Sequence, residues 1–102
     1  MDFDKKQTKL LLEQKAELLK SISHPVRLCI LTKLLYDGEC NVSHLQNCLD
    51  VPQSTVSQHL GKLRSSGVLE KERNGLEIHY SIANEEIRKV LEVLLEDIKG
   101  GI

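Results

Sequence analysis

A run of short polar side chains at the centre of the sequence offers hydrogen-bond donors and acceptors at helical spacing. The stretch PQSTVSQHL, residues 52–60, holds only two apolar side chains, Val56 and Leu60. Its polar members are Gln53, Ser54, Thr55, Ser57, Gln58 and His59. Gln pairs in a bidentate way with adenine, Ser and Thr hydroxyls accept several partners, and a Thr methyl contacts the thymine methyl. Ser and Thr are mediocre helix formers, so an idle solvated helix gains nothing from them. The pattern favours a helix that reads base edges.

Basic residues follow this run where a DNA backbone would need them. Residues 53–64 include two basic side chains and no acidic one, whereas residues 85–99 contain five acidic and three basic residues, a balance of −2. The net charge of the chain is −1, so the distribution of charge, and not its sum, predicts one face that accepts phosphate. The candidate DNA-binding residues are Gln53, Ser54, Thr55, Ser57, Gln58, His59, Lys62, Arg64, Lys71, Arg73 and Asn74.

The segments around the polar run predict a helix-turn-helix over residues 41–65. Asn41 is a good N-cap for a short helix that ends near Leu49. A tight connection over residues 50–52 then leads into a helix from Gln53 to about Ser65. The apolar positions of this second helix form one narrow inward stripe, made of Val56, Leu60 and Leu63.

A two-stranded hairpin is predicted next, over residues 68–82. Asn74-Gly75 is a strong hairpin signal because both residues accept positive φ. After it, Ile78, Tyr80 and Ile82 alternate with polar residues, which is the period of a half-buried strand. This alternation predicts that His79 faces solvent.

Three further helices complete the expected fold. The first spans residues 5–22, the second runs from Val26 to Tyr36 after Pro25 with Ser23 or His24 as its cap, and the last spans residues 85–99. The order is three helices and the DNA-reading helix, two strands, and a final helix. We therefore expect a mainly α (α+β) winged helix-turn-helix, with residues 1–102 forming one domain.

The terminal helices carry more apolar surface than one core-facing stripe needs. Such a surplus on a small domain usually covers a partner, and the simplest partner is a second copy. A well-packed monomer with a generous core is the alternative. The candidate dimer-interface residues are Leu11, Leu18, Val90, Leu91, Leu94, Leu95 and Ile98.

Composition argues against several other classes of protein. Aromatic residues make up 3% of the chain, too few for a single-strand stacking platform. We find no apolar run of transmembrane length and no signal peptide, which predicts a cytoplasmic protein without membrane contact. The 3 cysteines form no CxxC pair, which fits a reducing compartment. No serine-histidine-acid arrangement or carboxylate pair stands out, so we do not expect an enzyme.

At the level of whole motifs, the sequence resembles the ArsR/SmtB family of bacterial repressors. The resemblance rests on SHPVRLCILTKLL and QSTVSQHLGKLRSSGVLEKERNGLEIHYSI and covers about residues 16–95. It implies a homodimer, joined through its first and last helices, that represses by binding an imperfect inverted repeat in double-stranded operator DNA. The matching base-reading positions are Gln53, Ser54, Ser57 and Gln58, and residues 73–76 match the wing tip. The recognition segment and wing are most similar to PagR-type members, which are considered metal-independent.

The two metal sites of that family lack their ligands in this chain. Asn41 and Ser43 stand where one site has two cysteines, and Cys40 stands where the family has Leu. The positions that match the other site are Asn84, Glu86, Asp97 and Gly100, none of them a histidine. We therefore expect no metal and no other cofactor, and no inducing molecule is evident.

Cysteines leave one alternative open. Cys40, His44 and Cys48 are spaced by four, so they could share one edge and together hold Zn²⁺. The favoured interpretation is that Cys48 fills the core and that His44 is a surface residue. Cys40 beside a helix start is expected to be exposed, and with Cys48 it would form a thiol-based redox or sulfur-responsive switch. A winged-helix module that binds another protein is the remaining rival.

Overall fold

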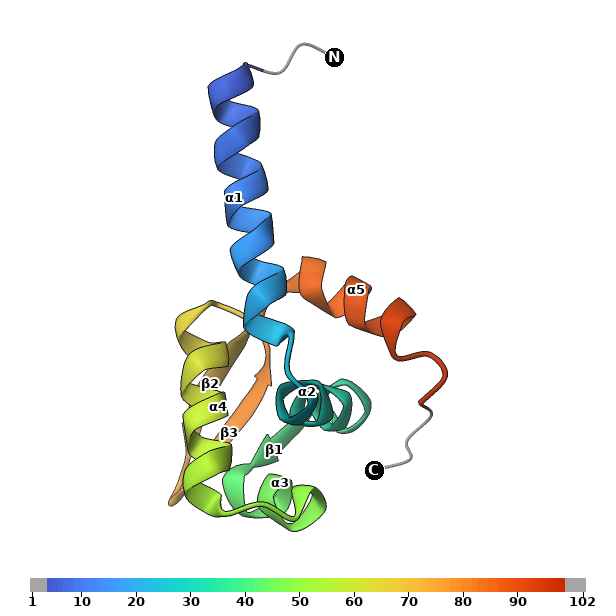
Figure 1. Ribbon diagram of the computed structural model, residues 1–102. Helices are drawn as coiled ribbons and strands as arrows, with labels where there is room; N and C mark the ends of the chain where they lie inside the picture. The colour runs from blue at the N-terminus through green and yellow to red at the C-terminus, as the bar shows by residue number, and fades with distance from the viewer. Residues whose placement is uncertain (1–3, 99–102) are drawn as a thin grey trace.

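The computed structural model describes residues 4–98, except for the side chain of Cys48. Mostly helical, it contains one small antiparallel sheet (Figure 1). Its elements are α1 (Lys5–Ile22), α2 (Pro25–Asp37), β1 (Glu39–Asn41), α3 (Val42–Leu49), α4 (Gln53–Ser65), β2 (Leu69–Asn74), β3 (Glu77–Ile82) and α5 (Glu85–Leu94). This is the predicted winged helix-turn-helix with one additional strand. Within the described residues, no helix is both long and apolar enough to cross a bilayer.

Side-chain caps mark the starts of α2, α3 and α5. The Nδ1 atom of His24 accepts a hydrogen bond of 3.0 Å from the Val26 amide, and Pro25 is the first residue of α2. Asn41 Oδ1 accepts a 2.8 Å bond from the His44 amide at the start of α3, and Asn84 Oδ1 does the same for Ile87 in α5. Each cap satisfies an amide that the helix itself leaves unpaired. The helix starts predicted from these residues are confirmed.

The prediction of a two-stranded sheet is incomplete. The short strand β1 pairs antiparallel with β3, which gives the strand order β1-β3-β2. In this ladder Cys40 lies opposite Tyr80. A strand of three residues is too short to show alternation, and its partner is distant in the sequence, so no local pattern could reveal it.

The wing differs from its predicted details in two ways. Because Asn74 pairs with Glu77, the turn is centred on Gly75 and Leu76, and Gly75 alone has positive φ (68°) there. The ring of His79 is not turned to solvent: its Nε2 donates to Glu77 Oε2 at 2.8 Å, and Glu39 Oε1 lies 3.5 Å from its Nδ1. The additional strand β1 lies beside β3 and brings Glu39 to the ring, which leaves the His79 side chain 19% exposed. Its bond to Glu77 lowers the pKa of that carboxyl.

The hydrophobic core lies where α2, α3, α4 and the base of the sheet meet. As predicted, α2 is the central helix and the α4 stripe is fully buried. The side chains without solvent exposure include Ile30, Leu31, Leu34, Leu45, Val56, Leu60, Leu63, Val68 and Leu91.

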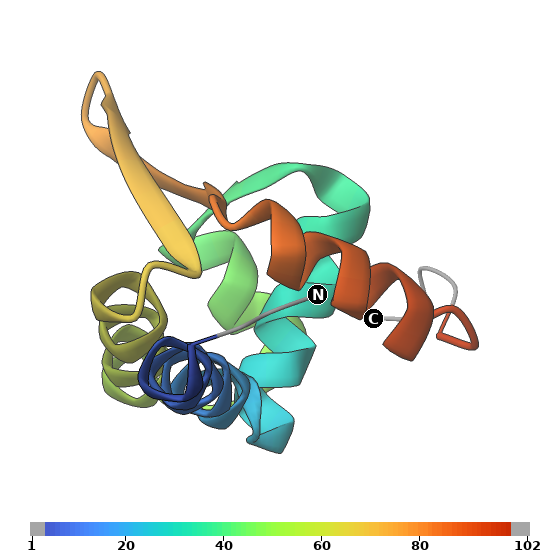
Figure 2. The same ribbon diagram turned by 90° about the horizontal axis from the view of Figure 1, so that it is seen from above.

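The two terminal helices differ in how they meet this core: α5 packs on it through Ile87 and Leu91, whereas α1 reaches it only at its C-terminal end. Helix α1 projects away from the body of the protein, with Ile22 its only buried residue (Figures 1 and 2). The projection raises the radius of gyration to 15.0 Å, against about 13 Å for a compact domain of this length. Helix α5 ends at Leu94, so the predicted extension towards Lys99, a residue that itself lies outside the described residues, is wrong. The Tyr36 hydroxyl donates to the Leu95 carbonyl at 3.3 Å, and the Leu95 side chain turns into the core, which closes the helix there.

Removing a core side chain of α2 should destabilise the whole fold. We expect Leu31→Ala to lower the free energy of unfolding by about 2–5 kcal/mol, because it leaves a cavity with no solvent access. The matched control is Leu76→Ala at the wing tip, where the side chain is 97% exposed. Urea unfolding at one protein concentration measures both, and equal losses would contradict the assigned core.

Candidate nucleic-acid interface

Helix α4 presents a polar outer face because its apolar stripe holds the opposite face in the core. Gln53, Ser54, Ser57 and Gln58 are exposed, and Thr55 is half-buried. The helix begins directly after Pro52, and no side chain caps its first amides. An uncapped first turn next to short polar side chains is suited to anionic and base-edge partners.

The connection between α3 and α4 sets the angle at which this face is presented. Asp50 ends α3 in the left-handed conformation (φ 54°, ψ 42°), and its amide donates to the Gln46 carbonyl at 3.3 Å. Asp tolerates this conformation better than most residues. Val51 is half-buried, and α4 starts two residues later. The helix-turn-helix predicted over 41–65 is thus confirmed as a structural unit.

The last candidate residue on the polar run, His59, is anchored to α2. Arg27 Nε donates to His59 Nδ1 at 3.1 Å, and the rings of His24 and His59 lie 4.5 Å apart between centroids. Because Nδ1 accepts, the proton of the neutral ring is on Nε2, where it can serve as a donor. The predicted phosphate contact of His59 therefore has an available atom, although the ring also braces α4 against α2.

The environment of His59 disfavours its charged form. Burial lowers its pKa first, and the positive charges of His24, Arg27 and Lys62 lower it further. The ring is thus neutral at pH 7 and acts as a hydrogen-bonding group, not as a cation.

Sequence reasoning missed Arg27. Besides its bond to His59, its Nη1 donates to the Ser21 carbonyl at 3.0 Å, so one guanidinium joins the end of α1, the start of α2 and the middle of α4. Arg27 and His59 are 32 positions apart in the sequence, and no local periodicity links them. Only the crossing of α2 and α4 brings them together.

The wing separates its charges onto two faces. In the β2–β3 register, Lys71 lies opposite Tyr80 and Arg73 opposite Ile78, on the same face as the buried pair Leu69 and Ile82. The other face carries Glu70, Glu72, Glu77 and His79. One face of the hairpin therefore has two parts. At the base it packs against α4, and towards the projecting tip it carries the basic residues Lys71 and Arg73 (Figure 2). Lys62 and Arg64 of α4 are also exposed.

The candidate redox residue Cys40 is not where it was expected. Its side chain is only 5% exposed because it lies in β1, facing the core, so the prediction of an exposed thiol beside a helix start is wrong. The side chain of the other candidate, Cys48, lies outside the described residues. Cys29 is half-buried in α2.

Residues at the family's metal positions have structural contacts instead. Asn41 and Asn84 cap helices, as described above. Glu86 forms an ion pair with Lys15, Nζ to Oε1 2.5 Å, between α5 and α1. Ser43 and Asp97 are exposed, and Gly100 lies outside the described residues.

Comparison with known proteins connects this geometry to a family. A family described as "Helix-turn-helix domain" matches residues 22–72. The transcriptional repressor PagR of Bacillus anthracis is 47% identical over 83 residues, which cover 81% of this chain and 83% of PagR. The biofilm growth-associated repressor of Xylella fastidiosa is 39% identical over 79 residues, 78% of this chain and 68% of that protein. The chain belongs to the ArsR/SmtB family of winged helix-turn-helix transcriptional repressors.

Solved structures of ArsR/SmtB proteins agree with the fold. The crystal structure of PagR superimposes with a TM-score of 0.78 at 45% identity and covers 84% of this chain and 98% of that one. The solution structure of a homodimeric winged helix-turn-helix DNA-binding domain from Mycobacterium bovis, a possible ArsR-family regulator, gives a TM-score of 0.81 at 28% identity, covering 96% and 90%. These relatives are transcriptional regulators, which agrees with the prediction that the chain carries no catalytic arrangement.

The position of His59 predicts a low titration midpoint. In an NMR titration of the folded protein, we expect His59 to titrate below pH 6.5, because burial and nearby cations oppose its protonation. The unfolded chain binds this proton more readily, so lowering the pH through 6.5 towards the folded midpoint should reduce stability through this residue. The urea-unfolded chain is the reference, and a folded midpoint at or above its value would contradict the assignment.

Proposed function

We propose that this protein is a homodimeric transcriptional repressor that binds an inverted-repeat DNA operator through α4 and the wing. The observation that carries the proposal is the exposed polar face of α4 next to the basic face of the hairpin, both on one side of the fold. Short side chains allow α4 to enter the major groove, where the amides of Gln53 and Gln58 can reach base edges. Lys62, Arg64, Lys71 and Arg73 supply phosphate contacts. A repressor that binds a bacterial operator would act in the cytoplasm.

Within this proposal the remaining candidate residues have distinct roles. Ser54 and Ser57 accompany the glutamines towards the bases, Thr55 is placed to contact a thymine methyl, and Asn74 lies where the wing tip would follow the minor groove. His59 donates to a phosphate through Nε2 while Arg27 holds its Nδ1.

A second copy of the chain would cover the apolar surface of α1 and α5. Most of the stability of a helix in a protein comes from packing of its apolar face, and α1 has one buried residue in the single chain, so packing against a partner would stabilise it. Leu11 of α1 is 41% exposed, and Leu94 at the end of α5 is 53% exposed. Val90 and Ile98 are also exposed, while Leu18 is half-buried.

Two of the candidate interface residues belong to the core of the single chain. Leu91 has no exposed surface and Leu95 almost none, so they support α5 from beneath instead of offering it a free face. The proposed interface is therefore the exposed set of Leu11, Val90, Leu94 and Ile98, with Leu18 at its edge. The M. bovis relative, a homodimer of similar fold, supports dimerisation as such.

The symmetry of such a dimer constrains its DNA target. Two copies of α4 related by a two-fold axis would read half-sites about 10 bp apart, or a small multiple of that. The names of the PagR and Xylella relatives support repression as the outcome. We further propose that neither of the two family metal sites operates in this protein, because their positions hold no cysteine or histidine and their described residues include two capping asparagines and an ion-paired glutamate.

Selection from a random pool of double-stranded DNA tests the proposal directly. Repeated binding and amplification at physiological salt should enrich an inverted repeat with the predicted spacing. Enrichment of no sequence would favour the rival class, a winged-helix module that binds another protein. A gel shift with the promoter region of the protein's own gene provides the second test.

Gln58 should contribute to sequence preference. We expect Gln58→Ala to weaken binding to the selected operator by about 1–3 kcal/mol, while binding to random DNA changes little, because its amide pairs with a base edge. Fluorescence anisotropy with both duplexes measures this difference.

Arg73→Ala on the wing is the matched comparison for Gln58→Ala. It should weaken binding to both duplexes and reduce the slope of log affinity against log salt by about 1, because a phosphate contact releases a counterion. If Gln58→Ala gives this pattern instead, Gln58 contacts the backbone. An unchanged slope for Arg73→Ala would exclude the wing from the phosphate contacts.

Placing a charge on the exposed end of α5 should prevent dimerisation. Leu94→Glu introduces a carboxylate into the proposed interface without touching the core, so we expect a monomer in sedimentation velocity at concentrations where the unmodified protein is a dimer. Leu76→Glu, the same substitution at the exposed wing tip, should remain dimeric. A dimeric Leu94→Glu protein would contradict the assigned interface.

A further inference from the structure

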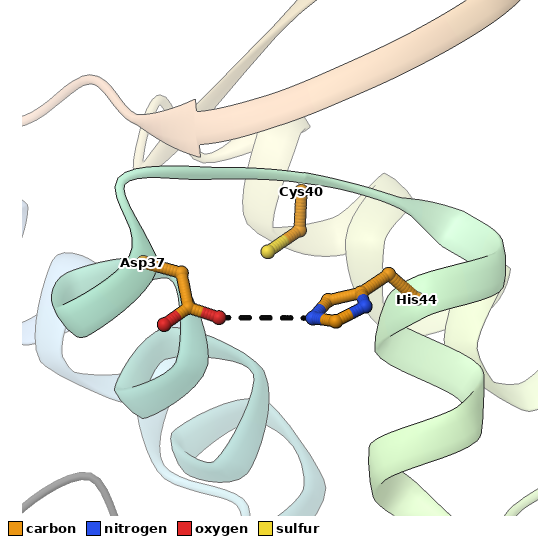
Figure 3. A group of neighbouring side chains, drawn as sticks. All are labelled: Asp37, Cys40 and His44. Atoms are coloured by element: carbon orange, nitrogen blue, oxygen red, sulfur yellow. Dashed lines mark ion pairs between the residues drawn. The ribbon is translucent and has the colours of Figure 1, made fainter.

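Three potential metal ligands meet at the junction of α2, β1 and α3. They are Asp37 at the end of α2, Cys40 in β1 and His44 in the first turn of α3, and one ligand atom of each lies within 4.8 Å of the others (Figure 3). The Nε2 atom of His44 is 3.7 Å from Asp37 Oδ2. The Cys40 sulfur points towards the space between these two side chains (Figure 3). None of the three residues occupies a position matched to the family's two metal sites.

We propose that Asp37, Cys40 and His44 form a binding site for a single divalent cation of the zinc type. A thiolate, an imidazole and a carboxylate are together the ligand set that Zn²⁺ accepts. Ca²⁺ and Mg²⁺ prefer oxygen ligands alone, and Cu(I) prefers soft sulfur ligands, so neither class fits the set as well. Three protein ligands leave a fourth position for water.

The spacing of the ligand atoms requires only side-chain adjustment. A tetrahedral zinc ion with ligand distances of about 2.0–2.3 Å holds its ligand atoms about 3.3–3.8 Å apart. The observed separations reach 4.8 Å at most, so a contraction of about 1 Å completes the geometry. The carboxylate of Asp37 and the ring of His44 are exposed, and rotation of these side chains can supply it.

The backbone around the site is already held in place. Gly38 takes a positive φ of 87° and its amide donates to the Leu34 carbonyl, which ends α2 directly after Asp37. The Asn41 cap fixes the first turn of α3 and therefore the backbone of His44. Cys40 is held opposite Tyr80 in the sheet. A site built on such elements loses little conformational entropy on binding.

The chemical state of the ligands suits a cation. Lys33 Nζ lies 2.8 Å from Asp37 Oδ2 and lowers the pKa of that carboxyl, so Asp37 is ionised at neutral pH. A bound divalent cation would replace Lys33 as its main counterion. Cys40 is nearly buried, but it lines a pocket that opens to solvent, together with Asp37 and His44. Glu39, Asn41 and His79 complete the lining of this pocket, through which a metal ion can reach the thiol. Zinc binding displaces the proton of a coordinating thiol.

Cobalt is the probe, because Co²⁺ takes the zinc geometry and is coloured. Titrating Co²⁺ into the reduced, untagged full-length protein should produce a thiolate-to-cobalt charge-transfer band and visible bands of tetrahedral intensity at one equivalent. Zn²⁺ should remove both. Zn²⁺ should also raise the thermal unfolding midpoint of the protein, since an ion that binds only the folded state stabilises it. None of these readouts requires DNA, so they are independent of the proposed operator binding.

Single substitutions assign the ligands. Cys40→Ser should abolish the thiolate band. Asp37→Asn and His44→Ala, both at exposed side chains, should each weaken Co²⁺ affinity by at least about tenfold, since even the loss of an outer-shell partner costs 10–100-fold in other metal sites. Cys29→Ser is the matched cysteine control and should leave the spectrum unchanged. Circular dichroism confirms that each variant is folded.

The outcomes that overturn the proposal are specific. The absence of a thiolate band in the unmodified protein at millimolar free Co²⁺ would remove the site. A band that survives Cys40→Ser, or one that disappears in Cys48→Ser, would mean that other residues bind the ion. Full affinity in both Asp37→Asn and His44→Ala would reduce the cluster to a lone thiol and contradict the assignment.

Discussion

The burial of one narrow apolar stripe on α4 is the constraint on which the rest of the structure depends. Val56, Leu60 and Leu63 have no exposed surface, and they hold α4 against α2 and the base of the sheet. With that face fixed, every polar residue on the opposite face must point outward. The same contact between α2 and α4 brings His59 next to Arg27, and the hydrogen bond between them helps to fix the orientation of α4. A helix with such a polar composition would be poorly stable alone, and tertiary packing compensates for its low propensity.

The distribution of charge on the wing depends on strand register more than on amino-acid composition. A chain with a net charge of −1 has little overall attraction to DNA, yet alternation along β2 puts Lys71 and Arg73 on one face and Glu70 and Glu72 on the other. The acidic face meets His79 and β1, while the basic face continues from the side that packs on α4. A shift of the register by one residue would exchange these faces and turn the acidic side towards any bound DNA.

The junction of α2, β1 and α3 links the wing to the interior of the protein. Cys40 is paired with Tyr80 of the wing strand, and His44 lies in the first turn of α3, the first helix of the helix-turn-helix. An ion held by Asp37, Cys40 and His44 would therefore join α2 to β1, which pairs with the wing strand β3, and to α3. The loss of the family's own metal positions to helix caps and an ion pair leaves this junction as the place where metal chemistry has the required ligands in the described part of the chain.

The sequence by itself determined the elements whose signals are local. Helical periodicity, the caps at His24, Asn41 and Asn84, and the glycine turn of the wing all act within a few residues, so the helix-turn-helix and the polar face of α4 followed from them. Only the tertiary structure decided what depends on distant pairs. These are the strand β1, the burial of Cys40, the contacts of His79 with Glu39, the brace from Arg27, the core positions of Leu91 and Leu95, and the meeting of Asp37 with His44. The early end of α5 has the same origin, because the contact of Tyr36 with Leu95 joins residues 59 positions apart. Such contacts form only when the chain has folded, and no period in the sequence encodes them.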